Sequence, residues 1–392
     1  MWNNVEAAPA DPILGLTEAF KSDSRADKVN LGVGVYQDKE GCTPVLDAVK
    51  QAEKILLENE TTKSYMPISG ATAYAAEVQK MIFGVESNRA ATVHTPGGTG
   101  ALRLAGELFK DFSSKTVWVS NPTWANHKNI FAAAGLSIKE YPYYCPATKA
   151  LDEEAFFAAL ETVPAGDCVL LHVCCHNPTG VDLSVDQWNR VAKLAVDKGW
   201  TALLDFAYQG FSVSIEADRA GAEAFLASGA DFMVASSFSK NFGLYRERTG
   251  ALTVVGTNTD AAAVAMSHMK RNARVLWSNP PAHGGQIVTT ILQNRELSQL
   301  WVSELGAMHD RIAQTRAALA DGLAERGVAM DCSFMTAQKG MFSFSGLTKE
   351  QVHFLKEEKA IYIVDSGRIN VAGLTSGNLD RVCNAVAEAM SR

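Results

Sequence analysis

The sequence predicts an α/β protein with a mostly parallel sheet flanked by helices, plus a smaller α+β domain. Short β-branched or aromatic runs alternate with stretches of helical period through the middle of the chain, a pattern typical of parallel sheets. Strands are expected at residues 116–120, 168–173, 202–206, 232–236 and 251–255. Each run ends near Asn, Asp, Ser, His or Gly, so polar groups should collect at the strand ends, where open α/β sheets bind ligands.

The C-terminal part of the chain follows a different pattern. Helical periodicity over residues 303–327 and 349–358 is followed by a strand-like run at 360–364 and a final helix. This order favours an α+β unit, and a length of 392 residues also favours two domains.

Charge and composition narrow the class of partner. The net charge is −7, and the chain has no long run of Lys or Arg, so neither nucleic acid nor a membrane surface is expected to bind. No apolar stretch reaches the roughly 18 residues of a membrane-spanning helix. The first residues lack the pattern of a signal peptide, and the seven cysteines form no CxxC pair, so a cytoplasmic protein with reduced thiols is expected.

A glycine-rich turn, His-Thr-Pro-Gly-Gly-Thr-Gly at residues 94–100, precedes a run of helical period. The exposed amides of a helix N-terminus suit a phosphate, which makes Gly98 and Thr99 candidate phosphate ligands. The spacing matches neither the dinucleotide-binding motif nor the P-loop. A plain turn is the alternative.

Lys240 follows directly on an apolar strand and stands among serines in Ser-Ser-Phe-Ser-Lys. Burial lowers the pKa of an amine, and a neutral amine is what covalent chemistry with a carbonyl group requires. The alternative is a solvated loop lysine.

Asp205 ends another apolar strand. A buried carboxylate needs a cationic partner, and a protonated pyridine nitrogen would serve. A helix N-cap or a structural ion pair is an equally simple explanation from spacing alone.

Two histidines and two cysteines between His172 and His176 resemble a metal site at first sight. No second ligand pair follows at zinc-like spacing, so no metal is expected and both histidines should be hydrogen-bonded polar groups. Asn177 precedes a proline, which holds it extended and able to present its amide to a ligand.

Arg274 and Arg368 are candidate carboxylate ligands, because a planar guanidinium matches a carboxylate in two-point fashion. A surface position is the simpler interpretation of each. Trp124 could stack on a ring, although a tryptophan more often belongs to the core.

Taken together, these segments resemble the class I aspartate/aromatic aminotransferases, which have fold type I of the pyridoxal-phosphate enzymes, and most of all their bacterial aspartate branch. The resemblance covers essentially the whole chain. Its motifs, in order, are residues 8–16, 30–36, Tyr65, the glycine turn, 174–180, 205–210, 239–245, 278–284 and 367–370.

The resemblance implies a role for each candidate residue. Lys240 would carry pyridoxal 5'-phosphate covalently, and Asp205 would pair with its pyridine nitrogen. Catalytic roles are implied for Lys240, Tyr65, Asp205 and Tyr208. The remaining cofactor contacts would come from Gly98, Thr99, Trp124, Asn177, Ser237, Ser239 and Arg248, with Tyr65 supplied by a partner subunit. Substrate would meet Gly34, Trp124, Asn177, Arg368 at its α-carboxylate, and Arg274 of the partner at its distal carboxylate.

The resemblance also implies a homodimer with shared active sites. The expected parts are an N-terminal arm at residues 1–12, a large cofactor-binding domain at 46–308, and a small domain made of 13–45 and 309–392. The small domain would close over substrate and expel water.

The implied reaction is transamination between L-aspartate and 2-oxoglutarate, giving oxaloacetate and L-glutamate. An aromatic aminotransferase with dual specificity for dicarboxylates and for tyrosine or phenylalanine is the alternative, since Gln37 and Ser64 depart from the residues usual in the aspartate branch. Val35, Thr43, Thr99 and Asn279 match that branch. A carbon–sulfur lyase would have little use for paired arginines, and a non-enzymatic cofactor-binding protein would lack Lys240 or Asp205.

Overall fold

The computed structural model describes residues 2–6 and 12–392, so half of the expected N-terminal arm, and the start of the motif at 8–16, lie outside the described residues. The chain divides into two compact units. The larger comprises residues 43–311 and 338–340, and the smaller comprises residues up to 42, 312–337 and 341–392.

The larger unit is built on a seven-stranded sheet in the order β2-β10-β9-β8-β7-β3-β4. All pairs are parallel except those of β10, which is antiparallel to both neighbours. The prediction of a mostly parallel sheet is therefore confirmed. The strands are β2 (Ala90–Pro96), β3 (Thr116–Asn121), β4 (Ser137–Pro142), β7 (Cys168–His172), β8 (Thr201–Phe206), β9 (Phe232–Ser237) and β10 (Thr249–Val255).

All five predicted strands are present, but the sequence did not reveal the two edge strands. Most side chains of β4 are exposed or only partly buried, so its sequence, Ser-Ile-Lys-Glu-Tyr-Pro, shows no apolar run. A short hairpin, β5 (Tyr144–Cys145) with β6 (Ala150–Leu151), follows it.

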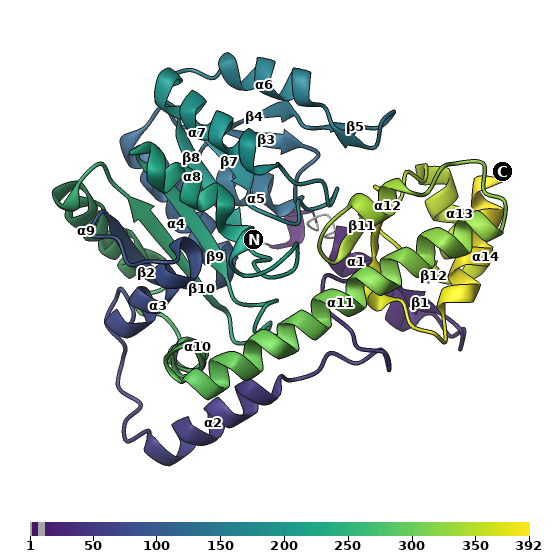
Figure 1. Ribbon diagram of the computed structural model, residues 1–392, viewed down its shortest axis with the longest axis horizontal. Coiled ribbons are helices and arrows are strands. Elements are labelled where there is room, and N and C mark those ends of the chain that lie inside the picture. The colour runs from purple at the N-terminus through teal and green to yellow at the C-terminus, as the bar shows by residue number, and fades with distance from the viewer. Residues whose placement is uncertain (1, 7–11) are drawn as a thin grey trace. The chain divides into compact units, whose positions relative to one another are not determined.

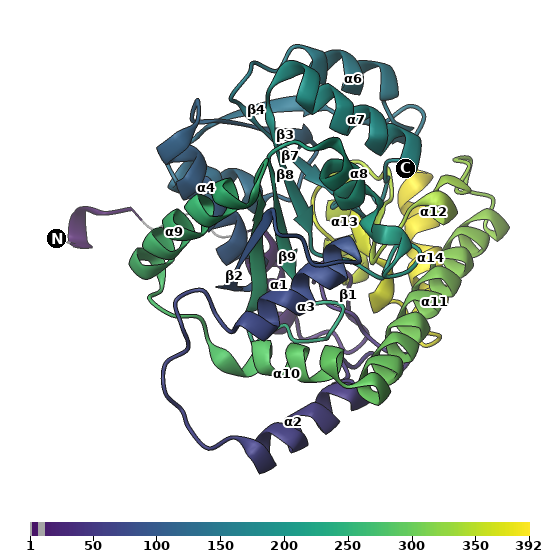
Figure 2. The ribbon, with the colours of Figure 1, turned by 60° about the vertical axis from the view of Figure 1, so that its left-hand side comes forward.

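Helices cover both faces of this sheet (Figures 1 and 2). On one face α4 (Gly97–Phe112), α5 (Asn126–Ala133) and α9 (Thr259–Leu276) enclose the main hydrophobic core. The apolar stripe expected after the glycine turn, Ala101, Leu104, Ala105 and Leu108, is buried in that core. The other helices of this unit are α2 (Asp47–Asn59), α3 (Thr72–Phe83), α6 (Glu153–Glu161), α7 (Val185–Lys198), α8 (Ala220–Ser228) and α10 (Ala282–Gln293), with a 3-10 turn at Ala217–Arg219.

The smaller unit is α+β, as predicted. Strands β11 (Phe342–Phe344) and β13 (Arg368–Asn370) pair antiparallel, and β1 (Val29–Asn30) pairs parallel with β12 (Ile361–Tyr362). Its helices are α1 (Pro12–Ser22), α12 (Phe334–Ala337), α13 (Lys349–Lys359) and α14 (Leu379–Met390), with 3-10 turns at Trp2–Asn4 and Val371–Gly373.

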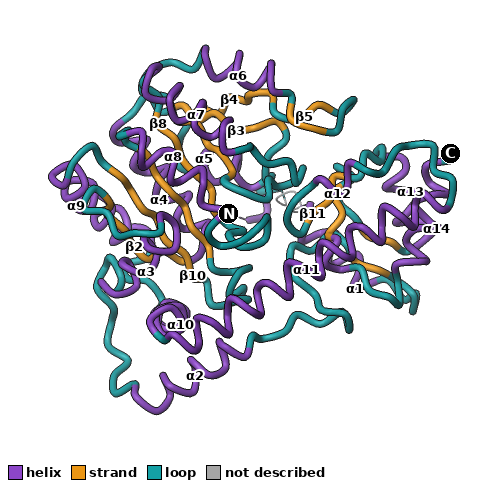
Figure 3. Tube along the Cα trace, viewed as in Figure 1, coloured by secondary structure: helices purple, strands orange, loops and turns teal. Residues whose placement is uncertain are grey.

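One helix, α11 (Arg295–Glu325), continues without a break from residues of the larger unit into residues of the smaller one (Figure 3). It begins eight residues before the predicted position, because the Asn294 side chain accepts hydrogen bonds from the backbone N–H groups of Glu296 and Leu297. None of the described helices combines the length and the apolar character needed to cross a bilayer.

Candidate active site

The carboxyl ends of three adjacent strands bring several of the predicted residues of the larger unit together. In the sheet register His172 lies beside Asp205, and Phe206 lies beside Ser236. Lys240 follows the end of β9 by three residues. The strand ends therefore form one polar region, as the sequence predicted.

Asp205 points to the face of the sheet that carries α5. It lies two residues after the core residue Leu203, and alternate residues of a strand share a face. There His127, the second residue of α5, places its Nε2 3.0 Å from Asp205 Oδ2. Burial raises the pKa of Asp205, but the hydrogen bond and the charge from His127, with a contribution from the charge of Lys240, outweigh it and hold the pKa below its usual value. Asp205 is thus an anion at neutral pH, and it caps no helix.

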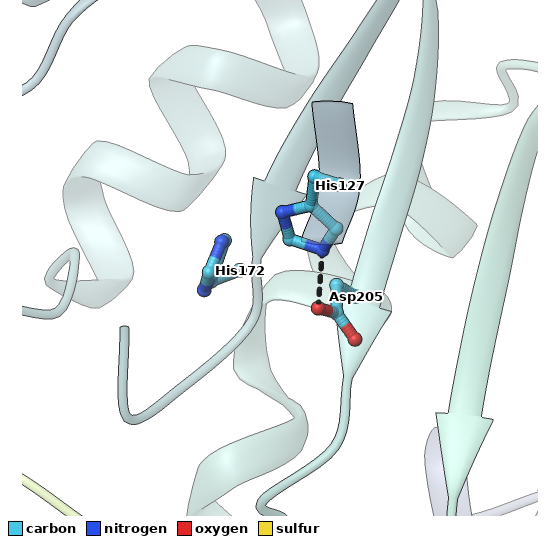
Figure 4. Close-up of side chains that lie close together, drawn as sticks. All are labelled: His127, His172 and Asp205. Atoms are coloured by element: carbon cyan, nitrogen blue, oxygen red, sulfur yellow. Dashed lines mark hydrogen bonds and ion pairs between the residues drawn. The ribbon is translucent and has the colours of Figure 1, made fainter. Parts of the chain in front are cut away.

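Figure 4 shows the bond between His127 and Asp205, with His172 beside them, and further polar contacts continue from His127. Thr123 Oγ1 lies 2.8 Å from His127 Nδ1 and 3.3 Å from His172 Nε2. The backbone N–H of Asn177 donates to His172 Nδ1 over 3.1 Å. The sequence of contacts is therefore Asp205, His127, Thr123, His172 and the Asn177 backbone.

The donor atoms of His127, His172 and Asp205 lie within 4.8 Å of one another, close enough to suggest a metal site. Both nitrogens of each histidine already lie in polar contacts, so the arrangement serves as a hydrogen-bond chain. Burial and the charge of His127 lower the pKa of His172 to about 3, which keeps it neutral. His176 is likewise hydrogen-bonded, to Ser120 and Thr179, as the sequence predicted for both histidines.

Lys240, Tyr208 and Asn177 lie at the same strand ends. Lys240 is partly buried, and its Nζ lies 4.9 Å from the centre of the Tyr208 ring. Tyr208 and Asn177 are buried. Trp124 is partly buried against the core and meets the His127 ring edge to face at 5.2 Å. A lysine, a phenol and a carboxamide thus lie near the Asp205 carboxylate.

The glycine turn, the end of β9 and the start of β10 form a cradle of small and cationic groups. A Cβ on Gly97 would lie 2.5 Å from Arg248 Nη2, and one on Gly98 would lie 3.0 Å from the Ser237 Cβ. Ser237 Oγ donates to Ser239 Oγ, and Arg248 Nη1 lies 3.5 Å from that same Ser239 oxygen. Side chains at the two glycines would fill this space.

These residues fit pyridoxal phosphate. A helix N-terminus with two serines and an arginine suits a dianionic phosphate. The Asp205 carboxylate, held ionised, suits a protonated ring nitrogen, and Lys240 supplies the amine that a cofactor aldehyde needs.

Tyr65 and Arg274 are both exposed, and a series of hydrogen bonds links Arg274 to Met66, the residue next to Tyr65. The Tyr65 side chain is 92% exposed. Arg274 donates to Ser278 Oγ, Ser278 donates to Asn279 Oδ1 over 2.9 Å, and Asn279 Nδ2 donates to the backbone oxygen of Met66 over 2.6 Å. Tyr65, on the loop after α2, and Arg274, near the end of α9, therefore belong to one exposed group.

The remaining predicted residues, Arg368 and Gly34, belong to the smaller unit. Arg368 on β13 is only 4% exposed, and its Nη2 donates to the Gly32 backbone oxygen over 2.7 Å. Its guanidinium lies over the Phe342 ring at 4.1 Å, and a Cβ on Gly34 would lie 3.2 Å from that same ring. The arginine is thus oriented by the backbone on one side and an aromatic face on the other.

Known proteins match the whole chain. Residues 26–386 fit the family model described as aminotransferase class I and II. The aspartate aminotransferase of Salmonella typhi is 51% identical over 100% of both chains, and the aromatic-amino-acid aminotransferase of Pseudomonas aeruginosa is 47% identical over 98% of both. The solved aromatic-amino-acid aminotransferase of Burkholderia pseudomallei, covalently bound to pyridoxal phosphate, superposes with a TM-score of 0.96 at 46% identity, over 100% of this chain and 99% of that one.

The chain belongs to the class I and II aminotransferases. As a member of this family it is a pyridoxal-phosphate-dependent aminotransferase with fold type I, and the predictions of family, fold, enzyme class and cofactor are confirmed.

Two residues of this aminotransferase site, Thr123 and His127, were not predicted from the sequence. His127 is the second residue of α5, and Thr123 lies in the loop just before that helix. Their spacing of four residues, which brings two side chains together on a helix, was a possible signal. Asp205, the partner of His127, is 78 positions away, and only the order of the sheet brings the two together.

Proposed function

We propose that the chain catalyses transamination between L-aspartate and 2-oxoglutarate, giving oxaloacetate and L-glutamate. The observation that carries the proposal is the ionised Asp205 carboxylate beside Lys240 at the strand ends. Relatives about half identical over their full length are named aspartate aminotransferase, which supports this choice of substrate.

The residues take the following roles in this proposal. Lys240 would hold the cofactor through its amine, and that amine, once free, would move the proton of the substrate α-carbon. Asp205 would keep the ring nitrogen of the cofactor protonated, while His127 keeps Asp205 ionised. The cofactor supplies an aldehyde for the substrate nitrogen and a ring that accepts the electron pair left at the α-carbon.

The remaining contacts bind and orient. Asn177 and Tyr208 would hydrogen-bond the phenolic oxygen of the cofactor, and Trp124 would pack against its ring. The phosphate would be held by Gly98, Thr99, Ser237, Ser239 and Arg248. Arg368, with Gly34 beside it, would bind the α-carboxylate of the substrate.

We further propose that Tyr65 and Arg274 act in the site of a partner subunit, in a homodimer. Two observations support this assignment: both residues are exposed, and hydrogen bonds link Arg274 to the neighbour of Tyr65 in the chain. Tyr65 then contacts the cofactor phosphate, and Arg274 the distal carboxylate of the substrate. Size-exclusion chromatography with light scattering tests the dimer, and a monomer with full activity would contradict it.

The domains that we propose are a large cofactor-binding domain at residues 46–308 and a small domain at 13–45 and 309–392, which would close over substrate. Cytoplasmic location is proposed as well, since all seven cysteines are free thiols.

A second candidate is dual specificity for aspartate and aromatic amino acids. Gln37 and Ser64, which depart from the aspartate branch, favour it, as does the aromatic aminotransferase that is 47% identical. Ser64 lies in the exposed segment beside Tyr65, where Thr62 Oγ1 donates to its hydroxyl over 2.9 Å.

One set of assays decides between these functions. Purified protein is tested with aspartate, glutamate, tyrosine and phenylalanine as amino donors against 2-oxoglutarate, or oxaloacetate for the glutamate reaction. Aspartate turnover far above aromatic turnover supports the first proposal, and comparable rates support the second. Borohydride reduction followed by peptide mapping should find the cofactor on Lys240, and cofactor on another residue would refute the assignment.

A further inference from the structure

We propose that Asp182 is a positioning residue that ties together the two turns carrying Asn177 and Tyr208, and thereby fixes both side chains against the phenolic oxygen of the cofactor. The inference rests on the proposed function of Asn177 and Tyr208. Asp182 itself has no role in the site described above.

The Asp182 carboxylate accepts hydrogen bonds from both turns. Its Oδ1 accepts from the backbone N–H of His176 over 2.9 Å, and its Oδ2 accepts from that of Cys175 over 2.8 Å. Oδ2 also accepts from Ser212 Oγ over 3.0 Å. Cys175 and His176 directly precede Asn177, and Ser212 lies four residues after Tyr208, so one carboxylate joins the two segments.

The first turn needs this support because its backbone is strained. Cys175 has φ of 52°, a left-handed conformation that a residue with a side chain adopts at a cost. The bond from its N–H to Asp182 stabilises that conformation. On the other side, the backbone N–H of Lys339 donates to the Gly180 oxygen over 2.7 Å, so the turn is held at both ends.

The second turn is shaped by another carboxylate, which Ser212 connects to the first. Asp218, which is buried, accepts from the backbone N–H groups of Gly210, Ser212 and Val213 over 2.8 to 3.0 Å. Ser212 therefore donates its N–H to Asp218 and its hydroxyl to Asp182. No ion pair involves either acid among the residues that the structure describes, so their hydrogen bonds serve to hold backbone.

Retaining two acids here without cations has an electrostatic cost. Burial, with a smaller contribution from the charge of Asp218, raises the pKa of Asp182 to about 6 even though the three hydrogen bonds lower it. An apolar pair would avoid that cost but could not accept from the five backbone N–H groups that donate to these two carboxylates. The geometry thus indicates that Asp182 and Asp218 serve to hold the two turns in place.

The test compares Asp182→Asn and Ser212→Ala with the control Asp186→Asn, an exposed acid in the first turn of α7. The asparagine keeps the size of Asp182 but turns an NH2 toward one set of donors. The readout is the pH at which the absorption of the bound cofactor changes in the holoenzyme, together with kcat and KM for aspartate. Circular dichroism and the Tm establish that each variant is folded.

Hydrogen bonds donated to the phenolic oxygen lower its attraction for a proton, so misplaced Asn177 and Tyr208 should move the spectral midpoint upward. We expect a rise of about one pH unit in Asp182→Asn, a smaller rise in Ser212→Ala and none in the control. The value of kcat should fall at least about tenfold in Asp182→Asn, while KM for aspartate stays within about threefold, since the arginines are untouched.

An unchanged midpoint in folded Asp182→Asn overturns the inference even if the enzyme is a transaminase. If that variant does not fold, an unchanged midpoint in Ser212→Ala overturns it. Absence of any cofactor absorption in the unaltered protein would instead contradict the proposed function.

Discussion

Replacing Gly97 by alanine should separate the cost of backbone strain from the loss of a phosphate ligand. Gly97, the first residue of α4, has φ of +72°, and a Cβ there would lie 2.5 Å from Arg248 Nη2 and 2.9 Å from its Cζ. Left-handed backbone costs an L-residue about 1–2 kcal/mol, and the lower entropy of the unfolded alanine chain returns about 0.4–1 kcal/mol. The expected loss of unfolding free energy is therefore about 1 kcal/mol.

The larger effect should fall on cofactor binding. The Arg248 side chain can move away from the new methyl group at little cost to the fold, but it then leaves the cradle. Losing one charge-assisted hydrogen-bonding partner of the phosphate costs about 1.5–3 kcal/mol, which corresponds to about 10- to 150-fold weaker binding.

Gly229→Ala provides the matched control. Gly229 follows α8, has φ of +78° and has no heavy atom within 4 Å of an added Cβ, so it carries the strain without the contact. Urea unfolding should show similar losses for both variants, while equilibrium dialysis of pyridoxal phosphate should show weaker binding only for Gly97→Ala. Equal cofactor affinity in the two variants would refute the assignment of Arg248 to the phosphate.

Four further outcomes are expected. Lys240→Ala should retain cofactor without a covalent bond and lose at least about 1000-fold in kcat in single-turnover and steady-state assays, and near-normal turnover would exclude it as the base. Arg274→Asp should exchange the preference for an acidic amino donor for a cationic one, and unaltered aspartate kinetics would remove that residue from the site. His127→Asn should raise the pKa of Asp205 and reduce kcat by about 10- to 100-fold, measured against an unchanged Tm. Burial lowers the pKa of His94 from 6.5 to about 4, so the stability that comes from its neutral form is fully present above pH 6.5 and is lost as the pH falls toward 4. Urea titrations at pH 7 and 5 give the change in unfolding free energy with pH, and His94→Gln should reduce that slope by up to about 1.4 kcal/mol per pH unit. An equal slope in both proteins would contradict this prediction.

Local patterns in the sequence were enough to predict the inner strands, the start of one helix and two residues of the site. Apolar runs located the inner strands, since strands buried on both faces need continuous hydrophobic sequence. The glycine turn located the start of α4, and the strand ends located Asp205 and Lys240. The family resemblance added the identity of the cofactor, because many motifs in one order are specific where each alone is not.

The tertiary structure alone decided which distant groups meet. The order of the sheet, in which β8, β7 and β3 are neighbours, is encoded by no local pattern, and it places His127 against Asp205 and His172 beside it. The same holds for Asp182, whose partners lie both before it in sequence and 30 residues after it. The periodicity of a segment predicts which of its side chains are buried. The ionisation of a carboxylate depends instead on the particular hydrogen-bond donors and charges that the fold places beside it.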